Sequence, residues 1–205
     1  MPIDLSPFLE PRGCAVVVFE CQENVVGPSS HLAGLVASVA SSGMLDHVAR
    51  LLDCARETGA GVFYCTAELR DDGLGSAKTP LMERLARAGN PGESADTSVV
   101  KAVAPRHGDV VIARSHGMTG FYDTGLDACL RDRETRTVIP VGVSLNVGIV
   151  GTTIEAVNRG YRVIVPTDCV AADPPEYAEP FLRYTIRNLA YITQSETICE
   201  AWRAA

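Results

Sequence analysis

The stretch PVGVSLNVGIVGTTIEAVNRGY, residues 140–161, decides how this chain folds. It opens with an apolar run that predicts a buried strand, and a helical pattern follows. The residues at helical spacing are Val147, Val150, Ile154 and Val157. Gly160 closes that pattern as a helix C-cap. Many α/β enzymes mount a nucleophile or hold an anion at such a strand-to-helix turn, yet this one has Ser144, Asn146 and Gly148 and no cysteine.

Apolar runs rich in β-branched residues recur along the chain. We expect strands over residues 14–19, 61–66, 109–114, 136–143 and 161–168. Because these runs are uninterrupted, they suit strands that are covered on both faces, as in a parallel sheet. The alternation with helical patterns predicts one doubly wound α/β domain over residues 1–205, with a mostly parallel sheet flanked by helices. In such sheets ligands bind beyond the carboxyl ends of the strands.

The segments between the strands carry helical patterns. We expect helices over residues 44–59, 80–89, 124–133 and 147–160, and a last helix over 176–192 that is interrupted near Pro180. Residues 25–43 are rich in small side chains and are compatible with a helix, a loop or a lid.

Composition excludes several classes of function. The 18 basic and 25 acidic residues give a net charge of −7, and no basic run is interleaved with aromatics, so we expect no nucleic-acid partner. No apolar run reaches the roughly 20 residues that span a bilayer, and the start of the chain lacks the pattern of a secretion signal. We therefore expect a soluble, cytoplasmic protein. The seven cysteines are scattered without CxxC spacing, which argues against a disulfide framework and a structural zinc site.

Polar residues directly follow three of the expected strands. They are Glu20 and Gln22 after the first, Arg114, Ser115 and His116 after the third, and Ser144 and Asn146 after the fourth. Because parallel strands end at the same edge of a sheet, these side chains are expected to converge on one pocket.

Three segments together resemble the isochorismatase-like hydrolases, also called the cysteine hydrolase superfamily. They are AVVVFECQENVVG, GDVVIARSHGMTGFYDTGLDACLR and VIPVGVSLNVGIVGTTIEAVNRGYRVIVPTDCVA. The resemblance covers the chain from Ala15 to about Ile192. It implies a three-layer α/β/α fold and a homo-oligomer, either a dimer or a tetramer.

The chain departs from the family at the catalytic positions. The family uses an aspartate, a lysine and, in its amidase branch, a cysteine, where this chain has Glu20, either Arg114 or Ser115, and Gly148. If the family's usual spacing between the lysine and the following phenylalanine is counted back from Phe121, Ser115 takes the lysine position. If residues are counted along the strand from Asp109, Arg114 takes it. The metal-binding version of the family needs histidines after the second strand, and FYCTAELRDDG has none, so we expect no metal and no cofactor.

Because Gly148 carries no thiol, this position cannot form the covalent acyl-enzyme that amide hydrolysis in the family requires. True isochorismatases also carry glycine there, because cleavage of a vinyl ether needs a proton donor and water. That resemblance implies Glu20 as general acid, kept protonated by apolar walls such as Phe121. Arg114 would clamp a substrate carboxylate, and the amides of Val147 and Gly148 would bind a carboxylate or oxyanion.

Other interpretations remain open at these positions. In one interpretation Glu20 and Arg114 form an ion pair with a structural role only. Cys21 is not expected to replace the missing nucleophile, because strand alternation points its side chain away from that of Glu20. His116 is either a base or donor in the site or a loop residue, and Gln22 either faces substrate or bonds to backbone groups. The prediction is therefore a non-thiol hydrolase of a small carboxylated metabolite. The alternative is a catalytically silent relative that binds a small ligand or serves an oligomeric regulatory role.

Overall fold

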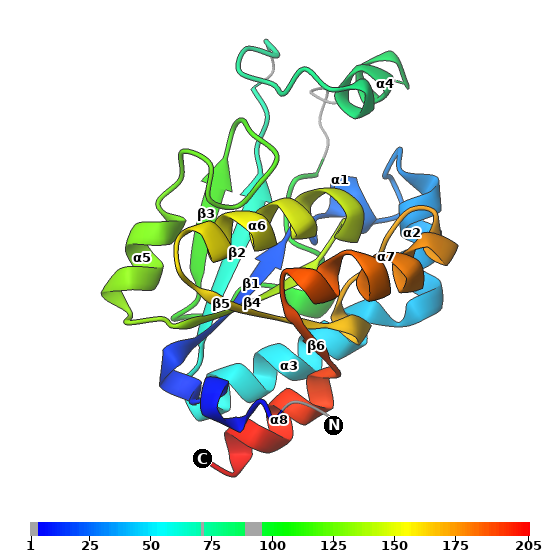
Figure 1. Ribbon diagram of the computed structural model, residues 1–205. Coiled ribbons are helices and arrows are strands. Elements are labelled where there is room, and N and C mark those ends of the chain that lie inside the picture. Colours follow the sequence, from blue (N-terminus) through cyan, green and yellow to red (C-terminus); the bar gives the residue numbers. More distant parts are fainter. Residues whose placement is uncertain (1–3, 71, 89–95) are drawn as a thin grey trace.

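A single parallel sheet organises the molecule, as the sequence predicts (Figure 1). The computed structural model describes residues 4–70, 72–88 and 96–205. The strands are β1 (Cys14–Phe19), β2 (Gly61–Ala67), β3 (Val110–Arg114), β4 (Thr137–Gly142), β5 (Arg162–Pro166) and β6 (Tyr191–Thr193). They are arranged in the order β3-β2-β1-β4-β5-β6, and every neighbouring pair is parallel.

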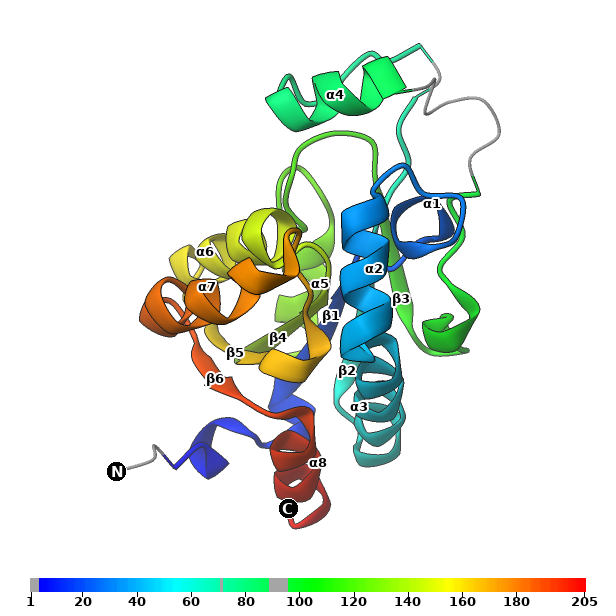
Figure 2. The ribbon, with the colours of Figure 1, turned by 90° about the vertical axis from the view of Figure 1, so that its right-hand side faces the viewer.

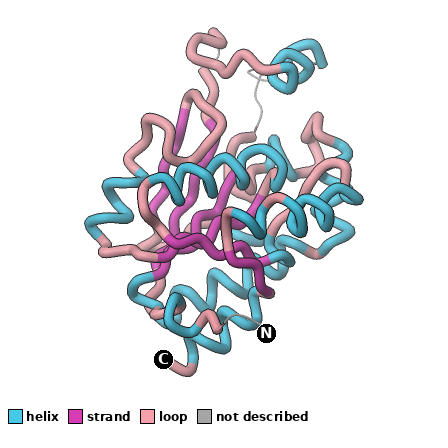
Figure 3. The backbone as a smooth tube through the Cα atoms, in the orientation of Figure 1, coloured by secondary structure: helices cyan, strands magenta, loops and turns pink. Residues whose placement is uncertain are grey.

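Helices cover both faces of this sheet. They are α1 (Glu23–Val26), α2 (Ala33–Ser42), α3 (Met44–Thr58), α4 (Pro80–Ala88), α5 (Leu126–Asp132), α6 (Val150–Asn158), α7 (Ala178–Tyr184) and α8 (Ser195–Arg203). Figures 1 and 2 show α2, α3 and α8 on one face of the sheet and α5, α6 and α7 on the other. Figure 3 distinguishes the strands, in magenta, from the helices, in cyan. Helix α4 stands clear of these layers in both views of the ribbon.

Burial on both faces explains the uninterrupted apolar runs of β1 and β4. The edge strand β3 departs from that expectation, because its Val111 is exposed. Along β1, Val16 and Val18 belong to the hydrophobic cluster beneath α3, whereas Val17 and Phe19 belong to the cluster beneath α5 and α6. Strand alternation thus sends successive side chains into two separate core layers.

The predicted last helix over residues 176–192 is wrong. Helix α7 ends at Tyr184, a 3-10 turn follows, and the chain then forms β6, which pairs with β5 through Tyr191 and Ile164. A free sheet edge beside a segment rich in β-formers outweighs a weak helical pattern. Helix α8 was not expected at all. The predicted end of the helix over 80–89 lies outside the described residues.

One further element refines the sequence-based expectations. Within residues 25–43 the structure has α2, which buries Leu35 and Val39 against the core. None of the helices in the described part of the chain is long and apolar enough to cross a membrane.

Candidate functional site

Glu20 stands at the carboxyl end of β1, in a bent piece of backbone. Its φ angle is +49°, in the left-handed region that residues with a side chain rarely adopt. Its amide donates to the carbonyl oxygen of Cys65 at 3.1 Å, which fixes the bend against β2. A backbone held in this region costs on the order of 1–3 kcal/mol, so the surrounding structure must compensate for it.

Arg114 ends β3 and is the ion-pair partner of Glu20. Its Nη2 contacts Glu20 Oε1, and its Nη1 donates to the carbonyl oxygen of Gly117 at 2.7 Å. The guanidinium carbon lies 5.0 Å from the centre of the Phe19 ring. Only 4% of the Arg114 side chain is exposed, against 22% for Glu20, so solvent reaches the pair from the carboxylate side.

Burial shifts the charge equilibrium of this arginine. Removal from water lowers the pKa of Arg114 to about 10, which still leaves the guanidinium positive at neutral pH. Its Nε is buried and has no hydrogen-bond partner among the described residues.

The structure separates the two residues that compete for the family's lysine position. Arg114 contacts Glu20, whereas the Oγ of Ser115 lies 3.1 Å from Nδ1 of His116. Nε2 of His116 in turn lies 3.2 Å from Oδ2 of Asp123. The sequence does not single out Asp123, because its contact with His116 depends on how the loop after β3 folds back on itself. The three side chains form a separate chain of contacts beside the Glu20–Arg114 pair.

The turn after β4 leaves no room for a nucleophile. A Cβ added at Gly148 would lie 2.2 Å from Cε1 of the Phe19 ring, and Phe19 is 1% exposed. Gly148 belongs to a π-helical turn (Leu145–Ile149) that precedes α6, and the Val143–Ser144 peptide before it is cis. The aromatic ring of β1 therefore fills the space in which a larger side chain at Gly148 would stand.

The amides of this turn are partly engaged. Those of Val147 and Ile149 both donate to the carbonyl oxygen of Ser144, at 3.2 Å and 3.0 Å. The expected anion-binding role of Val147 therefore requires its amide to exchange partners. Gly148 offers close backbone approach, but only from the side that Phe19 leaves open.

Gln22 is bonded to backbone groups. Its Nε2 donates to the carbonyl oxygens of Ala67 and Thr97 at 3.1 Å and 2.7 Å, and its Oε1 accepts from the amide of Ala67 at 2.7 Å. The side chain is fully buried. Gln22 thus joins the end of β1 to the end of β2, which is one of the two roles that the sequence left open.

Two further candidates lie in the core around the site. Phe121 is 3% exposed, stacks on Tyr161 with 6.1 Å between ring centres, and shares a core cluster with Phe19. Cys21 is buried, and burial raises the pKa of its thiol to about 12, so it is not a nucleophile at neutral pH. Within the described ranges, no group of three His, Cys, Asp or Glu residues is placed to hold a metal ion.

This arrangement offers an ion pair and no thiol. A carboxylate that is open to solvent can transfer a proton, and a buried guanidinium can bind a carboxylate through two parallel hydrogen bonds. Both groups lie at the carboxyl ends of strands, where ligands bind in folds of this class.

Comparison with known proteins connects this site to one family. The family model described as Isochorismatase domain matches residues 14–197. The chain is 28% identical to maleamate amidohydrolase of Pseudomonas putida over 80% of this chain and 76% of that protein. It is 27% identical to a ureidoacrylate amidohydrolase of Methylobacterium radiotolerans over 82% of this chain and 70% of that one.

Solved structures share the fold at lower sequence identity. A cysteine hydrolase from Pseudomonas syringae pv. phaseolicola has a TM-score of 0.79 at 23% identity, and the match covers 100% of this chain and 96% of the other. An isochorismatase family protein from Desulfovibrio vulgaris also has a TM-score of 0.79 at 23% identity, with 94% and 99% covered.

Proposed function

The chain belongs to the isochorismatase family, whose named relatives are hydrolases, and on that premise we propose a non-thiol hydrolase of a small carboxylated metabolite. The proposed reaction is acid-assisted cleavage of a vinyl ether with Glu20 as the general acid. The observation that carries it is the contact between Glu20 and the buried guanidinium of Arg114.

The ion pair sets the charge of Glu20 before substrate arrives. Contact with a guanidinium favours the carboxylate form of Glu20. A substrate carboxylate that binds Arg114 takes over that guanidinium, and the freed Glu20 carboxyl then lies beside a second anion. That like charge favours the protonated form of Glu20, so substrate binding itself prepares the acid.

The reaction then proceeds through an oxocarbenium ion and a hemiketal. Glu20 donates its proton to the terminal vinyl carbon, and the adjacent carbon becomes an oxocarbenium ion. Water adds to that carbon and returns a proton to Glu20. The resulting hemiketal breaks its bond to the ether oxygen while its hydroxyl proton passes to that oxygen, which leaves a keto acid and an alcohol.

The named relatives support the substrate class but not the bond that is broken. Maleamate and ureidoacrylate are small carboxylic acids, which suits a site built on a buried guanidinium. Amide hydrolysis through a thiol would need a cysteine at Gly148, and Phe19 fills that space. We therefore propose that the substrate of this chain is a carboxylic acid as small as maleamate and ureidoacrylate, and that the bond broken is not an amide.

A pair of substrates tests this proposal. Isochorismate supplies a vinyl ether with carboxylates, and maleamate supplies a carboxylated amide. We expect pyruvate from isochorismate in a lactate dehydrogenase assay, no ammonia from maleamate, and an unchanged rate after treatment with iodoacetamide. Ammonia from maleamate without pyruvate from isochorismate would overturn the proposal.

The second candidate function is a silent family member that binds a small ligand. One observation favours it: the Phe19 ring fills the space before Gly148 while Arg114 holds Glu20. Saturable binding of both acids without turnover of either would establish this alternative. Assembly into a dimer or tetramer and a cytoplasmic location stay predictions.

A further inference from the structure

A polar hollow lies at the amino ends of the strands, opposite the end that carries Glu20. Its volume is about 460 Å³, and it is lined by Arg131, Thr135, Arg136, Arg159, Gly160, Tyr161 and Arg162. These residues surround the amino ends of β4 and β5, where Thr137 pairs with Arg162. Glu20 and Arg114 instead stand at carboxyl ends, so the two sites are separated by the length of the strands.

Four guanidinium groups line this hollow, and their pairing is incomplete. Arg131 pairs with Asp127, Arg136 with Glu10 and Arg159 with Glu155, each at 3.0 Å. Arg162 has no ion-pair partner in the described part of the chain, and its guanidinium carbon lies 3.7 Å from the centre of the Phe8 ring. In a chain of net charge −7, this hollow therefore has a positive charge to spare.

The paired arginines also keep donors available. Each guanidinium has five N–H groups, and Arg136 uses Nη2 for Glu10 while Arg159 uses Nη1 for Glu155. The side chains of Arg131 and Arg136 are 56% and 69% exposed, and ion pairs at such exposure contribute little stability. An anion with more charge than one carboxylate can therefore recruit these arginines.

Thr135 is a further lining residue with a polar group that lacks a hydrogen-bond partner among the described residues. The residue is 7% exposed, and its hydroxyl has no hydrogen-bond partner among the described residues. Buried hydroxyl groups in native proteins are generally bonded, and this unpartnered one belongs to a residue that lines the hollow.

We propose that this hollow binds a phosphate group, either free or as the monoester of a small metabolite. A carboxylate is planar and is satisfied by one guanidinium fork, whereas phosphate presents several oxygens in different directions and suits several forks at once. The volume lies within the range of small-molecule sites. The site is separate from the proposed hydrolytic one and does not depend on it.

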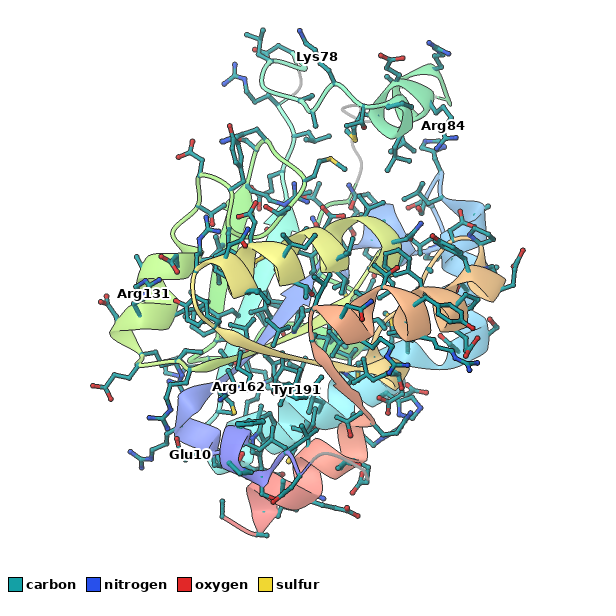
Figure 4. All side chains as sticks on the ribbon, in the orientation of Figure 1. Glu10, Lys78, Arg84, Arg131, Arg162 and Tyr191 are labelled. Carbon is teal, nitrogen blue, oxygen red and sulfur yellow. The ribbon has the colours of Figure 1, made fainter. Side chains whose placement is uncertain are left out.

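Calorimetric titration at constant ionic strength tests this proposal. The probes are inorganic phosphate and glucose 6-phosphate, with chloride as the balancing salt. The variant is Arg162→Gln, and its matched control is Arg84→Gln, another exposed arginine without an ion pair among the described residues. Figure 4 shows Arg84 at the top of the view, beside α4, and Arg131 and Arg162 lower in the view, away from Arg84.

We expect saturable binding of phosphate or its ester to the wild-type protein and to Arg84→Gln, with affinity reduced at least tenfold in Arg162→Gln. Tighter binding of the ester than of free phosphate would identify a phosphorylated metabolite, and the reverse would identify inorganic phosphate. Thr135→Val, which removes only the hydroxyl, should also weaken binding without lowering the Tm. Equal affinity in the wild-type protein and Arg162→Gln, or no binding at all, would overturn the proposal.

Discussion

Phe19 determines what the turn at Gly148 can carry. Its ring is the last apolar side chain of β1, and the guanidinium of Arg114 lies over it while Gly148 abuts it. One residue thus separates the ion pair from the turn. The sequence identifies Glu20, Arg114 and Gly148 because they stand at strand ends. It does not reveal the ring between them, since that contact depends on how a side chain packs across two strands.

Gly148→Ala should lower the free energy of unfolding. The new Cβ would lie 2.2 Å from the Phe19 ring, which is buried and has little room to move. Overpacking of this kind costs about 1–3 kcal/mol. Urea unfolding measures the change.

Gly125→Ala is the matched control for that experiment. Its φ is −78°, and apart from chain neighbours and its own helix no described heavy atom lies within 4 Å of an added Cβ. We expect a change within about 0.5 kcal/mol. If Gly148→Ala were as stable as Gly125→Ala, Phe19 would not fill that space.

At the scale of elements, the sequence predicts the strands as far as β5, whereas it does not predict β6 and α8 at the end of the chain. Continuous apolar runs predict β1, β2, β4 and β5 because burial on both faces demands them. Strand β6 has only three residues, of which Tyr191 and Thr193 are half-buried, so it carries no such signal. Its position follows from the free edge of β5, which no local pattern encodes.

Gln22→Met should destabilise the ends of β1 and β2 together. The substitution keeps the size of a buried side chain but removes three hydrogen bonds to the backbone of Ala67 and Thr97. Each unsatisfied buried group costs about 1–3 kcal/mol, and we expect a total loss of about 3 kcal/mol in urea unfolding.

The control for this prediction is Gln194→Met. Among the described residues the Gln194 side chain bonds only to the hydroxyl of Thr167, at an exposed position, so its loss should cost less than about 1 kcal/mol. Equal effects of the two variants would show that Gln22 does not tie the strands together.

At the scale of the whole molecule, the two core layers protect the thiols. Cys129 is half-buried, whereas the cysteines at positions 14, 21, 54, 65, 169 and 199 are buried. All seven are free thiols. Their scatter along the sequence predicts this pattern, since small apolar side chains suit a packed interior.

Burial also makes stability depend on pH in the alkaline range. It raises the pKa of Cys21 and of Cys65 from 9.0 to about 12, and that of Tyr64 from 10.0 to about 12. The unfolded chain ionises these groups first and so binds fewer protons, which means that the free energy of unfolding falls as pH rises above 9.

We therefore expect urea unfolding to show a lower free energy of unfolding at about pH 10 than at about pH 8. Arg114 acts in the opposite direction, because its pKa falls from 12.5 to about 10, but its effect grows only above that lower value. Cys65→Ala should reduce the slope. A free energy of unfolding that stays constant between the two pH values would contradict the burial of these groups.

The central claim is that chemistry at this site depends on the Glu20 carboxylate in place of a thiol. The rate of pyruvate release from isochorismate by Glu20→Gln tests it most directly, with Glu23→Gln as the control three residues away. We predict that kcat falls at least 100-fold in Glu20→Gln, within the range of general acid catalysis, and that Glu23→Gln matches the wild-type protein. A Glu20→Gln variant that keeps the wild-type rate with an unchanged circular dichroism spectrum would contradict the claim.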